Sequence, residues 1–297
     1  MTLAVMRQFV APHPALQSSG NRRTGITLDI GKRIERPMTH PATSTSASRR
    51  SVPAPTLQAV IPYCELRPHC ASCGMRNLCL PAGLGPEAIR QLDQIVSNHA
   101  RVKKRDCLYR SGDPFTSLYA IRLGTFKSLV LTRDGREQVT RYHMGGEIIG
   151  TDGIGDSRHT CDVIALEDSE VCVLPFDKLD RLARDVPSLR RNLFRFISRD
   201  LCHSHDMMFL LGSMRAEERL AVFLLDLADR YQARGYSPHE FVLRMTREEL
   251  ASYLGMKLET VSRLFSRLQA EGLIQVQGRT IKLLDSSGIG RLIGQHC

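Results

Sequence analysis

The 297-residue sequence contains no apolar run near the ~18 to 20 residues that a membrane-spanning helix needs. We expect no signal peptide, because Arg7 interrupts the apolar opening MTLAVMRQFVAPHP and no small-residue cleavage pattern follows. There is no phosphate-binding glycine loop, and no arrangement of His, Ser or acidic residues indicates a nucleophilic active site. These absences predict a cytoplasmic protein that neither spans a membrane nor acts as an enzyme.

Cysteine is what the sequence does concentrate. In a reducing compartment nine cysteines, an odd number, favour metal ligation or redox chemistry over disulfides. Cys70, Cys73 and Cys79 form a C-x2-C-x5-C pattern in the loop-like stretch HCASCGMRNLC, and Cys64 precedes them. Three thiolates need a fourth ligand for zinc or an iron-sulfur cluster. That ligand could be Cys64 or the distant Cys172, which could equally be a small core residue, and the spacing alone leaves cluster, zinc and no metal comparable.

The positive charge is concentrated at the N-terminus. The formal net charge is +10, and residues 1–60 contribute +6 of it, from eight Arg and Lys against two acidic residues. These residues are rich in Ser, Thr and Pro and contain one aromatic residue, Phe9, so they cannot bury enough apolar surface to fold. We expect a disordered basic leader that either contacts phosphates non-specifically or has no role.

The middle of the chain has the pattern of an antiparallel β-domain. From about residue 102 to 176, short apolar runs alternate with turns, as in SLYAIRLGTFKSLVLTRDGREQVTRYHMGGEIIG, with Asp134 and Gly135 at a hairpin turn. Recurring glycines suit the tight corners of a small barrel or roll. We place this domain at residues 83–183.

A long helix is predicted over residues 184–214. Its residues at spacings of three and four form one seam: Phe194, Ile197, Leu201, Ser204, Met208 and Leu211. Such a seam either faces a second copy in a parallel dimer or packs on the chain's own β-domain, and periodicity favours neither. Ser204 in the middle of the seam would lower stability and tune the association.

The C-terminal residues 215–297 contain the pattern of a winged helix-turn-helix. In RMTREELASYLGMKLETVSRLFSRLQAEGLIQVQGRTIKLL, a helix over Arg247–Leu254 meets Gly255 at the turn, and a second helix covers about Leu258–Ala270. The stretch LIQVQGRTIKLL then predicts a two-stranded wing that turns at Gly278 and Arg279. These features in register favour binding to double-stranded DNA.

Glu259, Ser262 and Arg263 lie on one face at the start of the second predicted helix. Arg can donate twice to guanine, Glu can accept from cytosine and Ser can contact a base edge, whereas the alternative is a solvated ion pair. Inside a helix-turn-helix we favour base contact. Candidates for contacts with backbone phosphates are Arg247, Lys257, Arg267 and Arg279.

The order of cysteine segment, β-roll, long helix and winged helix-turn-helix resembles the CRP/FNR superfamily of bacterial transcription regulators, in particular its oxygen-sensing FNR (fumarate and nitrate reduction) branch. The resemblance covers about residues 65–290 and is carried by HCASCGMRNLCLP, SLYAIRLGTFKS, EVCVLPF, AEERLAVF and LETVSRLFSRLQ. It implies an α+β fold with an N-terminal β-roll of the cyclic-nucleotide-binding jelly-roll type, a long dimerisation helix and a C-terminal winged helix-turn-helix. The cysteine-rich segment would span residues 61–82.

The resemblance also implies a cofactor. It carries over four ligands of an oxygen-labile 4Fe-4S cluster: Cys70, Cys73, Cys79 and Cys172. Cys64 is left out, because the family's essential triplet is the C-x2-C-x5-C set. Gly74 and Leu78, beside the ligands, would then control access of oxygen to the cluster.

Partners follow from the same resemblance. Glu259, Ser262 and Arg263 would read the half-site TTGAT of a TTGAT-N4-ATCAA palindrome, bound by a homodimer under low oxygen. The hairpin at Thr132, Asp134 and Gly135 would face RNA polymerase. At Ser204 the best-known members carry Asp, so oxygen control of dimerisation is expected to be less strict here.

Two alternatives stay open within the same superfamily. A zinc-stabilised regulator indifferent to oxygen would use the same thiols. A cyclic-nucleotide-controlled regulator is weaker, because the Arg-Ser pair that binds the phosphate in that branch is missing from GTDGIGDSRHTCDV, where Arg158 stands without the rest of the motif.

Overall fold

The computed structural model describes residues 69–96, 98–132 and 134–294. The predicted leader at 1–60 and the cysteines at 64 and 297 lie outside these ranges. No helix in the described part of the chain is long and apolar enough to cross a membrane.

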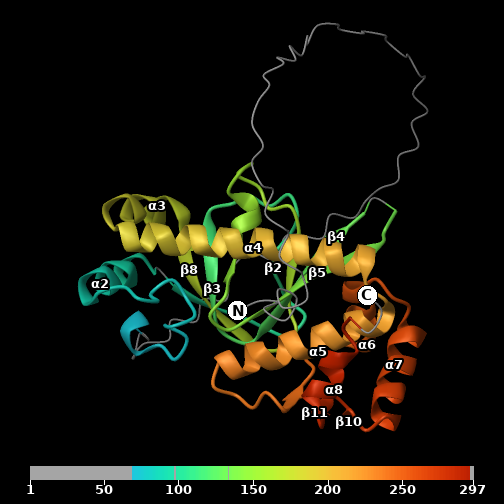
Figure 1. The fold of residues 1–297 in the computed structure, drawn as a ribbon. Coiled ribbons are helices and arrows are strands. Elements are labelled where there is room, and N and C mark those ends of the chain that lie inside the picture. Colours follow the sequence, from blue (N-terminus) through green and yellow to red (C-terminus); the bar gives the residue numbers. More distant parts are fainter. Residues whose placement is uncertain (1–68, 97, 133, 295–297) are drawn as a thin grey trace, which may run out of the picture. The chain divides into compact units, whose positions relative to one another are not determined.

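The first half of the described chain is a β-roll framed by helices (Figure 1). Its elements in chain order are α2 (Pro86–Ile95), β1 (Asn98–Val102), β2 (Cys107–Tyr109), β3 (Ser117–Leu123), β4 (Thr125–Leu131), β5 (Glu137–Met144), β6 (Ile148–Ile149), β7 (Asp162–Ala165), β8 (Ser169–Pro175) and α3 (Phe176–Asp185). The predicted β-domain is therefore confirmed, but α2 and α3, which lie inside the predicted 83–183 range, were not foreseen.

Two antiparallel four-stranded sheets make the roll, in the orders β1-β8-β3-β6 and β2-β7-β4-β5. Strand β8 is internal, with Cys172 paired to His99 of β1 and to Ala120 of β3. Its alternation sends Val171 and Leu174 into separate buried clusters, and Cys172 packs on the same cluster as Leu174. The thiol is thus placed on the face of the sheet opposite Val171, as the alternation predicts.

The long helix α4 (Pro187–Ser213) begins with proline at its first turn, where no backbone donor is lost. One face is buried: Leu189, Asn192, Phe196, His203, Met207 and Leu210. The opposite face leaves most of the predicted seam exposed: Phe194, Ile197, Leu201, Ser204 and Met208. Leu211 departs from the prediction, because it is half-buried and packs on the core of the C-terminal domain.

The C-terminal domain is a winged helix-turn-helix. Its elements are α5 (Ala216–Ala233), β9 (Glu240–Val242), α6 (Arg247–Leu254), α7 (Leu258–Ala270), β10 (Ile274–Gln277), β11 (Thr280–Leu283) and α8 (Ser286–Arg291). The predicted bounds of α6 and α7 are confirmed. The wing has a third strand, β9, paired to β11, that the prediction of a two-stranded wing omitted.

Local chemistry explains why the helix-turn-helix could be read from the sequence. Thr246 accepts from the backbone of Glu249, and the Glu249 side chain accepts from Thr246, a capping box at the start of α6. Gly255 ends the helix in the left-handed region, with φ of 61°. Both signals involve only neighbouring residues, so they define the ends of α6 whatever the rest of the chain packs against it.

Helix α6 packs against strand β5 of the roll. Lys127 of β4 pairs with Glu249 at 2.9 Å, and the backbone N–H of Val139 donates to the Ser252 hydroxyl at 2.9 Å. The rings of Tyr142 and Tyr253 lie 4.9 Å apart within one buried cluster. The winged helix-turn-helix and the roll therefore share a core.

Gly124, between β3 and β4, lies so close to Ser169 that a larger residue would not fit. We expect Gly124→Ala to lower the free energy of unfolding by about 1 to 3 kcal/mol more than Gly112→Ala. Both glycines have positive φ, 94° and 90°, but a Cβ at Gly124 would lie 2.0 Å from Ser169 Oγ, whereas one at Gly112 meets nothing within 4 Å. Chemical denaturation followed by circular dichroism measures the difference, and equal losses in the two variants would contradict the clash.

Candidate metal centre and nucleic-acid interface

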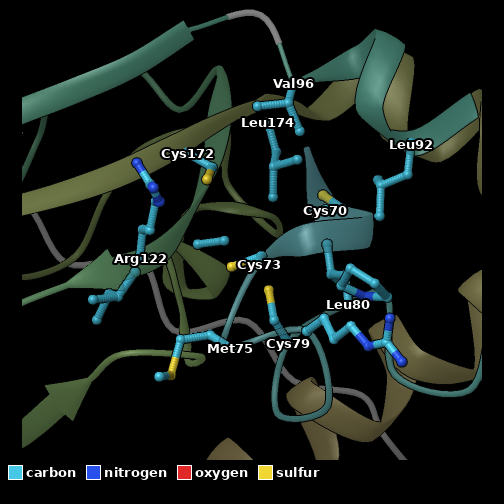
Figure 2. Close-up of a pocket in the computed structure, with 14 residues that line it drawn as sticks. Cys70, Cys73, Met75, Cys79, Leu80, Leu92, Val96, Arg122, Cys172 and Leu174 are labelled. Carbon is cyan, nitrogen blue, oxygen red and sulfur yellow. The ribbon is translucent and has the colours of Figure 1, made fainter. Parts of the chain in front are cut away.

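Cys70, Cys73, Cys79 and Cys172 line one cavity on the roll. Figure 2 shows their sulfur atoms facing a common space, three from the loop and one from β8. Much of the remaining wall is apolar: Met75, Leu80, Pro81, Leu92, Val96, Ala120, Ile121 and Leu174. The structure thus brings together the four thiols that the resemblance selected, although 93 residues separate Cys79 from Cys172.

The loop curls because of short-range backbone hydrogen bonds. The N–H of Arg76 donates to the carbonyl of Cys73 at 3.1 Å, and the N–H groups of Leu78 and Cys79 donate to the carbonyl of Met75 at 3.0 Å. These turns direct the three loop thiols towards β8. Leu80, only 1% exposed, then anchors the end of the loop in the roll.

Helix α4 holds the same end of the loop. The side-chain amide of Asn192 donates to the carbonyls of Leu80 at 2.8 Å and Ala82 at 2.9 Å. Asn192 is 5% exposed, so losing these bonds would leave buried polar groups unpaired. The position of the loop is therefore tied to the helix that carries the exposed apolar seam.

Three of the four thiols, those of Cys70, Cys79 and Cys172, have pKa values raised above the ordinary value and favour the protonated form when no metal is bound. Burial raises the pKa of Cys79 and of Cys172 to about 12, and burial together with the Asp93 carboxylate raises the pKa of Cys70. A metal must supply the positive charge that ionises them, and its binding releases protons. Because lower pH keeps the thiols protonated, metal binding weakens as the pH falls.

Polar groups around the cavity were not foreseen from the sequence. His99 Nδ1 lies 3.5 Å from Cys172 Sγ and 3.5 Å from Glu170 Oε1, and Arg122 Nη1 lies 2.6 Å from the same carboxylate oxygen. Asp93 accepts from the backbone N–H of Cys70 at 2.6 Å. No spacing in the sequence relates these residues to the thiols, because strands and helix bring them together from separate segments.

The donor set fits a thiolate-bound metal centre, since four thiols gather with apolar walls and cationic Arg122 beside them. As the side chains stand, residues 69–96, 98–132 and 134–294 contain no three His, Cys, Asp or Glu side chains close enough to hold a single metal ion. The cavity measures about 30 Å³. Gly74 is exposed with open space at its Cβ position, and Leu78 is half-buried.

The segment that would hold a cyclic nucleotide's phosphate contains a carboxylate instead. Asp152 accepts from the Tyr109 hydroxyl at 3.1 Å, from the Thr160 N–H at 2.8 Å, and lies 3.4 Å from His159 Nδ1. Burial alone would raise the pKa of Asp152, but these hydrogen bonds hold it at about 2. Arg158 donates to the Gly112 carbonyl at 2.6 Å. A phosphate would therefore meet a negative charge here.

Helix α7 presents the predicted base-reading residues to solvent. Glu259, Ser262 and Arg263 are all exposed, while Val261 and Phe265 on the other face are buried. The Ser262 hydroxyl donates to the Leu258 carbonyl at 3.0 Å, which leaves its lone pairs available as acceptors. The three predicted residues thus share one exposed face.

The four predicted phosphate contacts differ in their surroundings. Lys257 and Arg279 are exposed, next to the start of α7 and in the wing turn. The Arg279 guanidinium also donates one hydrogen bond, to the Arg244 carbonyl at 3.1 Å. Arg267 pairs with Glu271 at 2.8 Å and with a residue of α5 at 3.0 Å. The Arg247 guanidinium lies 3.3 Å from the centre of the Phe265 ring and is partly buried. The side chains of Arg247 and Arg267 are therefore engaged within the chain.

The predicted hairpin between β4 and β5 is exposed. Gly135 has φ of 84°, and Asp134 accepts from Thr132 and from Arg136, the latter at 2.8 Å. These bonds preorganise a polar tip that projects from the roll.

Two domain families match the chain. Residues 218–292 match the Crp-like helix-turn-helix domain, and residues 99–185 match the cyclic nucleotide-binding domain. The transcriptional regulatory protein btr of Bordetella pertussis is 44% identical over 81% of this chain and 99% of its own length. The fumarate nitrate reduction regulatory protein of Klebsiella oxytoca is 41% identical over 76% and 91%, respectively. The solved structure of FixK2 from Bradyrhizobium japonicum is 28% identical, covering 67% of this chain and 98% of that one, with a TM-score of 0.62.

The carboxylate at Asp152 predicts that cyclic AMP does not bind. We expect 1 mM cyclic AMP, roughly saturating for an ordinary small-ligand site, to leave the thermal unfolding midpoint unchanged, because only a ligand that binds the folded state raises it. Differential scanning fluorimetry on the full chain measures this. A midpoint that rises with cyclic AMP concentration would show that the segment accepts the phosphate after all, and 5′-AMP serves as the matched control ligand.

Proposed function

Because this chain belongs to the CRP/FNR family of transcription regulators, we propose that it binds a 4Fe-4S cluster and regulates transcription in response to oxygen. The observation that carries the proposal is the convergence of Cys70, Cys73 and Cys79 with Cys172 on one cavity. Relatives named as anaerobic and fumarate-nitrate-reduction regulators support the same assignment. As a DNA-binding regulator it would work in the cytoplasm.

Ligation would fasten the loop to the roll. Such a cluster, when bound, supplies a link that oxygen breaks. Three thiolates from the loop and the Cys172 thiolate from β8 would hold it. The loop would then be fixed to the roll from Cys70 to Cys79. The Asn192 amide, bonded to the carbonyls that follow Cys79, would carry the loop's position to α4. Leu78 and Gly74 would limit oxygen access.

The exposed seam on α4 supports a parallel homodimer. Phe194, Leu201 and Met208 are 63%, 58% and 64% exposed, an unusual state for large apolar side chains on one helix face. Pairing with a second copy would bury them, and the flanking Ile197 and Ser204 would complete the seam. Leu211 would stay packed on the C-terminal core of its own chain and would not take part in the pairing.

A dimer would place two α7 helices in successive major grooves about 34 Å apart. Glu259, Ser262 and Arg263 would read TTGAT in each half of a TTGAT-N4-ATCAA site. Lys257 and Arg279 are exposed, and Arg279 makes only one hydrogen bond, to the Arg244 carbonyl. They would therefore contact phosphates more readily than Arg247, which lies on the Phe265 ring, and Arg267, which is paired with carboxylates.

The polar tip at Thr132, Asp134 and Gly135 would contact RNA polymerase bound beside the site. Its exposure and its internal hydrogen bonds support a preformed contact surface.

Removal of the distant thiol tests the cluster. We expect anaerobically purified Cys172→Ala to lose most iron and sulfide, because three loop thiols cannot complete four-fold ligation. Cys161→Ala, which removes another half-buried thiol of the roll, should keep full iron and sulfide. Iron and sulfide assays with visible absorption provide the measurement.

A full cluster in Cys172→Ala would overturn the fourth-ligand assignment. Colourless wild-type protein that contains zinc would overturn the cluster itself and favour the oxygen-indifferent regulator.

Removal of a base contact tests the reading of DNA. We expect Arg263→Ala to weaken binding of the cluster-containing protein to the TTGAT-N4-ATCAA duplex by about 1 to 3 kcal/mol per half-site. The variant should also lose much of its preference for one base pair of the half-site. Arg279→Ala should instead weaken binding to all duplexes alike and reduce the salt dependence. Fluorescence anisotropy across salt concentrations separates the two. If Arg263→Ala behaved as Arg279→Ala does, the base-contact assignment would be wrong.

A further inference from the structure

The turn of residues 145–147, between β5 and β6, touches the cysteine loop on one side. A Cβ placed on Gly146 would lie 2.7 Å from Leu78 Cβ, and one placed on Gly145 would lie 3.4 Å from Met75 Sδ. Met75 and Leu78 stand between the loop thiols Cys73 and Cys79. Glycine at position 146 therefore lets Leu78 pack directly on the backbone of the turn, whereas at position 145 even a Cβ would be in ordinary contact with Met75.

The same turn is gripped by the DNA-binding domain on another side. Arg234, at the C-terminal end of α5, donates to the Gly145 carbonyl at 2.8 Å and to Glu147 Oε1 at 2.6 Å. Arg230 of α5 donates to the same oxygen at 2.9 Å and to the Tyr142 carbonyl at 2.7 Å. Arg230 and Arg234 are 10% and 6% exposed at their side chains, so these bonds lie in the domain interface.

The hydrogen bonds between Glu147 and the two arginines depend strongly on where the turn lies, because all three groups are charged and largely buried. Burial alone would raise the pKa of the Glu147 carboxyl, but Arg230 and Arg234 hold it well below its ordinary range. A buried carboxylate keeps its charge only while its partners stay in place, because an unpaired charge in this interior is costly. The turn is itself fixed to the roll, since the Gly146 N–H donates to the Ile121 carbonyl at 2.8 Å.

We propose that the 145–147 turn couples the cysteine loop to the DNA-binding domain inside a single chain, in addition to any effect on dimerisation. When the loop is fastened, Met75 and Leu78 hold the turn where Arg230 and Arg234 can reach it, which positions α5 and the helices packed on it. When the loop is released, the turn loses its contact with Met75 and Leu78 and keeps its backbone hydrogen bonds to the roll. The hydrogen bonds from Arg230 and Arg234 of the α5 region to the turn then weaken. This inference rests on the proposed function, because fastening requires the metal centre.

The grip differs from other contacts between the two domains. Lys127 and Glu249 also form a largely buried ion pair between the roll and α6, at 2.9 Å, but neither residue touches the turn. Removing that pair should weaken domain docking without breaking the connection to the cysteine loop. Lys127→Gln is therefore the matched control for Arg234→Gln.

The test separates coupling within a chain from dimerisation. Two full-length chains are joined by a long Gly/Ser linker, so that loss of the cluster cannot dilute the dimer. Affinity for the TTGAT-N4-ATCAA duplex is measured by anisotropy for loaded and air-treated protein, and the ratio of the two dissociation constants is the readout. We expect a ratio of about 5 to 150 in the tethered wild type.

Arg234→Gln should bring this ratio close to one while the iron and sulfide content stays at the wild-type level. Lys127→Gln should keep the wild-type ratio even if both affinities fall. An unchanged ratio in Arg234→Gln, or a ratio of one in the tethered wild type, would overturn the coupling while leaving the proposed function intact. A wild type without iron and sulfide would overturn both.

Hydrogen-deuterium exchange on the wild-type chain gives a second test that does not depend on any variant folding correctly. We expect amides of residues 145–147 and of α5 to exchange faster, by at least several-fold, once the cluster is removed. The amides of β10 and β11, in the wing, serve as the internal reference. Equal protection of the turn and of α5 in both states would contradict the proposal.

Discussion

Packing of the cysteine loop against the β-roll is the contact on which the rest of the arrangement depends. The loop has too few apolar residues to form a core of its own, so its order comes from what it touches: Leu80 enters the core of the roll, and Asn192 of α4 binds the carbonyls of Leu80 and Ala82. The loop thus contacts the sheet that carries Cys172 and the helix that carries the exposed seam. A change at the thiols can reach both.

A second constraint lies between the roll and the DNA-binding domain. Glu147, Arg230 and Arg234 are charged and largely buried, and breaking such a group by removing one partner costs about 3 to 5 kcal/mol. The cost makes the interface specific in geometry, because both guanidinium groups must reach the same oxygen, Glu147 Oε1. The tilted ring pair of Tyr142 and Tyr253 adds buried area to the same interface. Charged pairs therefore define where α5 sits on the roll.

Prediction from sequence succeeded where the signals are local. The capping box at Thr246, the left-handed Gly255 and the alternation around Cys172 each act over a few residues, and the predicted helices and the β-domain are confirmed. Short elements were missed: β9 has three residues, too few to show alternation, and α2 has only ten residues, which follow the turn-rich stretch PAGLG. Leu211 follows the seam's spacing, yet the nearby C-terminal core covers it.

By itself the sequence determined the order of the domains, the helix-turn-helix and the face of α7 that meets solvent, because periodicity and capping are properties of neighbouring residues. The four thiols were selected by family resemblance, and their spacing alone left three readings open. Only the tertiary structure decided that Cys172 meets the loop, that His99 and Arg122 stand beside it, and that Arg267 also meets Glu217 of α5. Contacts across sheets and domains depend on distances that no spacing along the chain encodes.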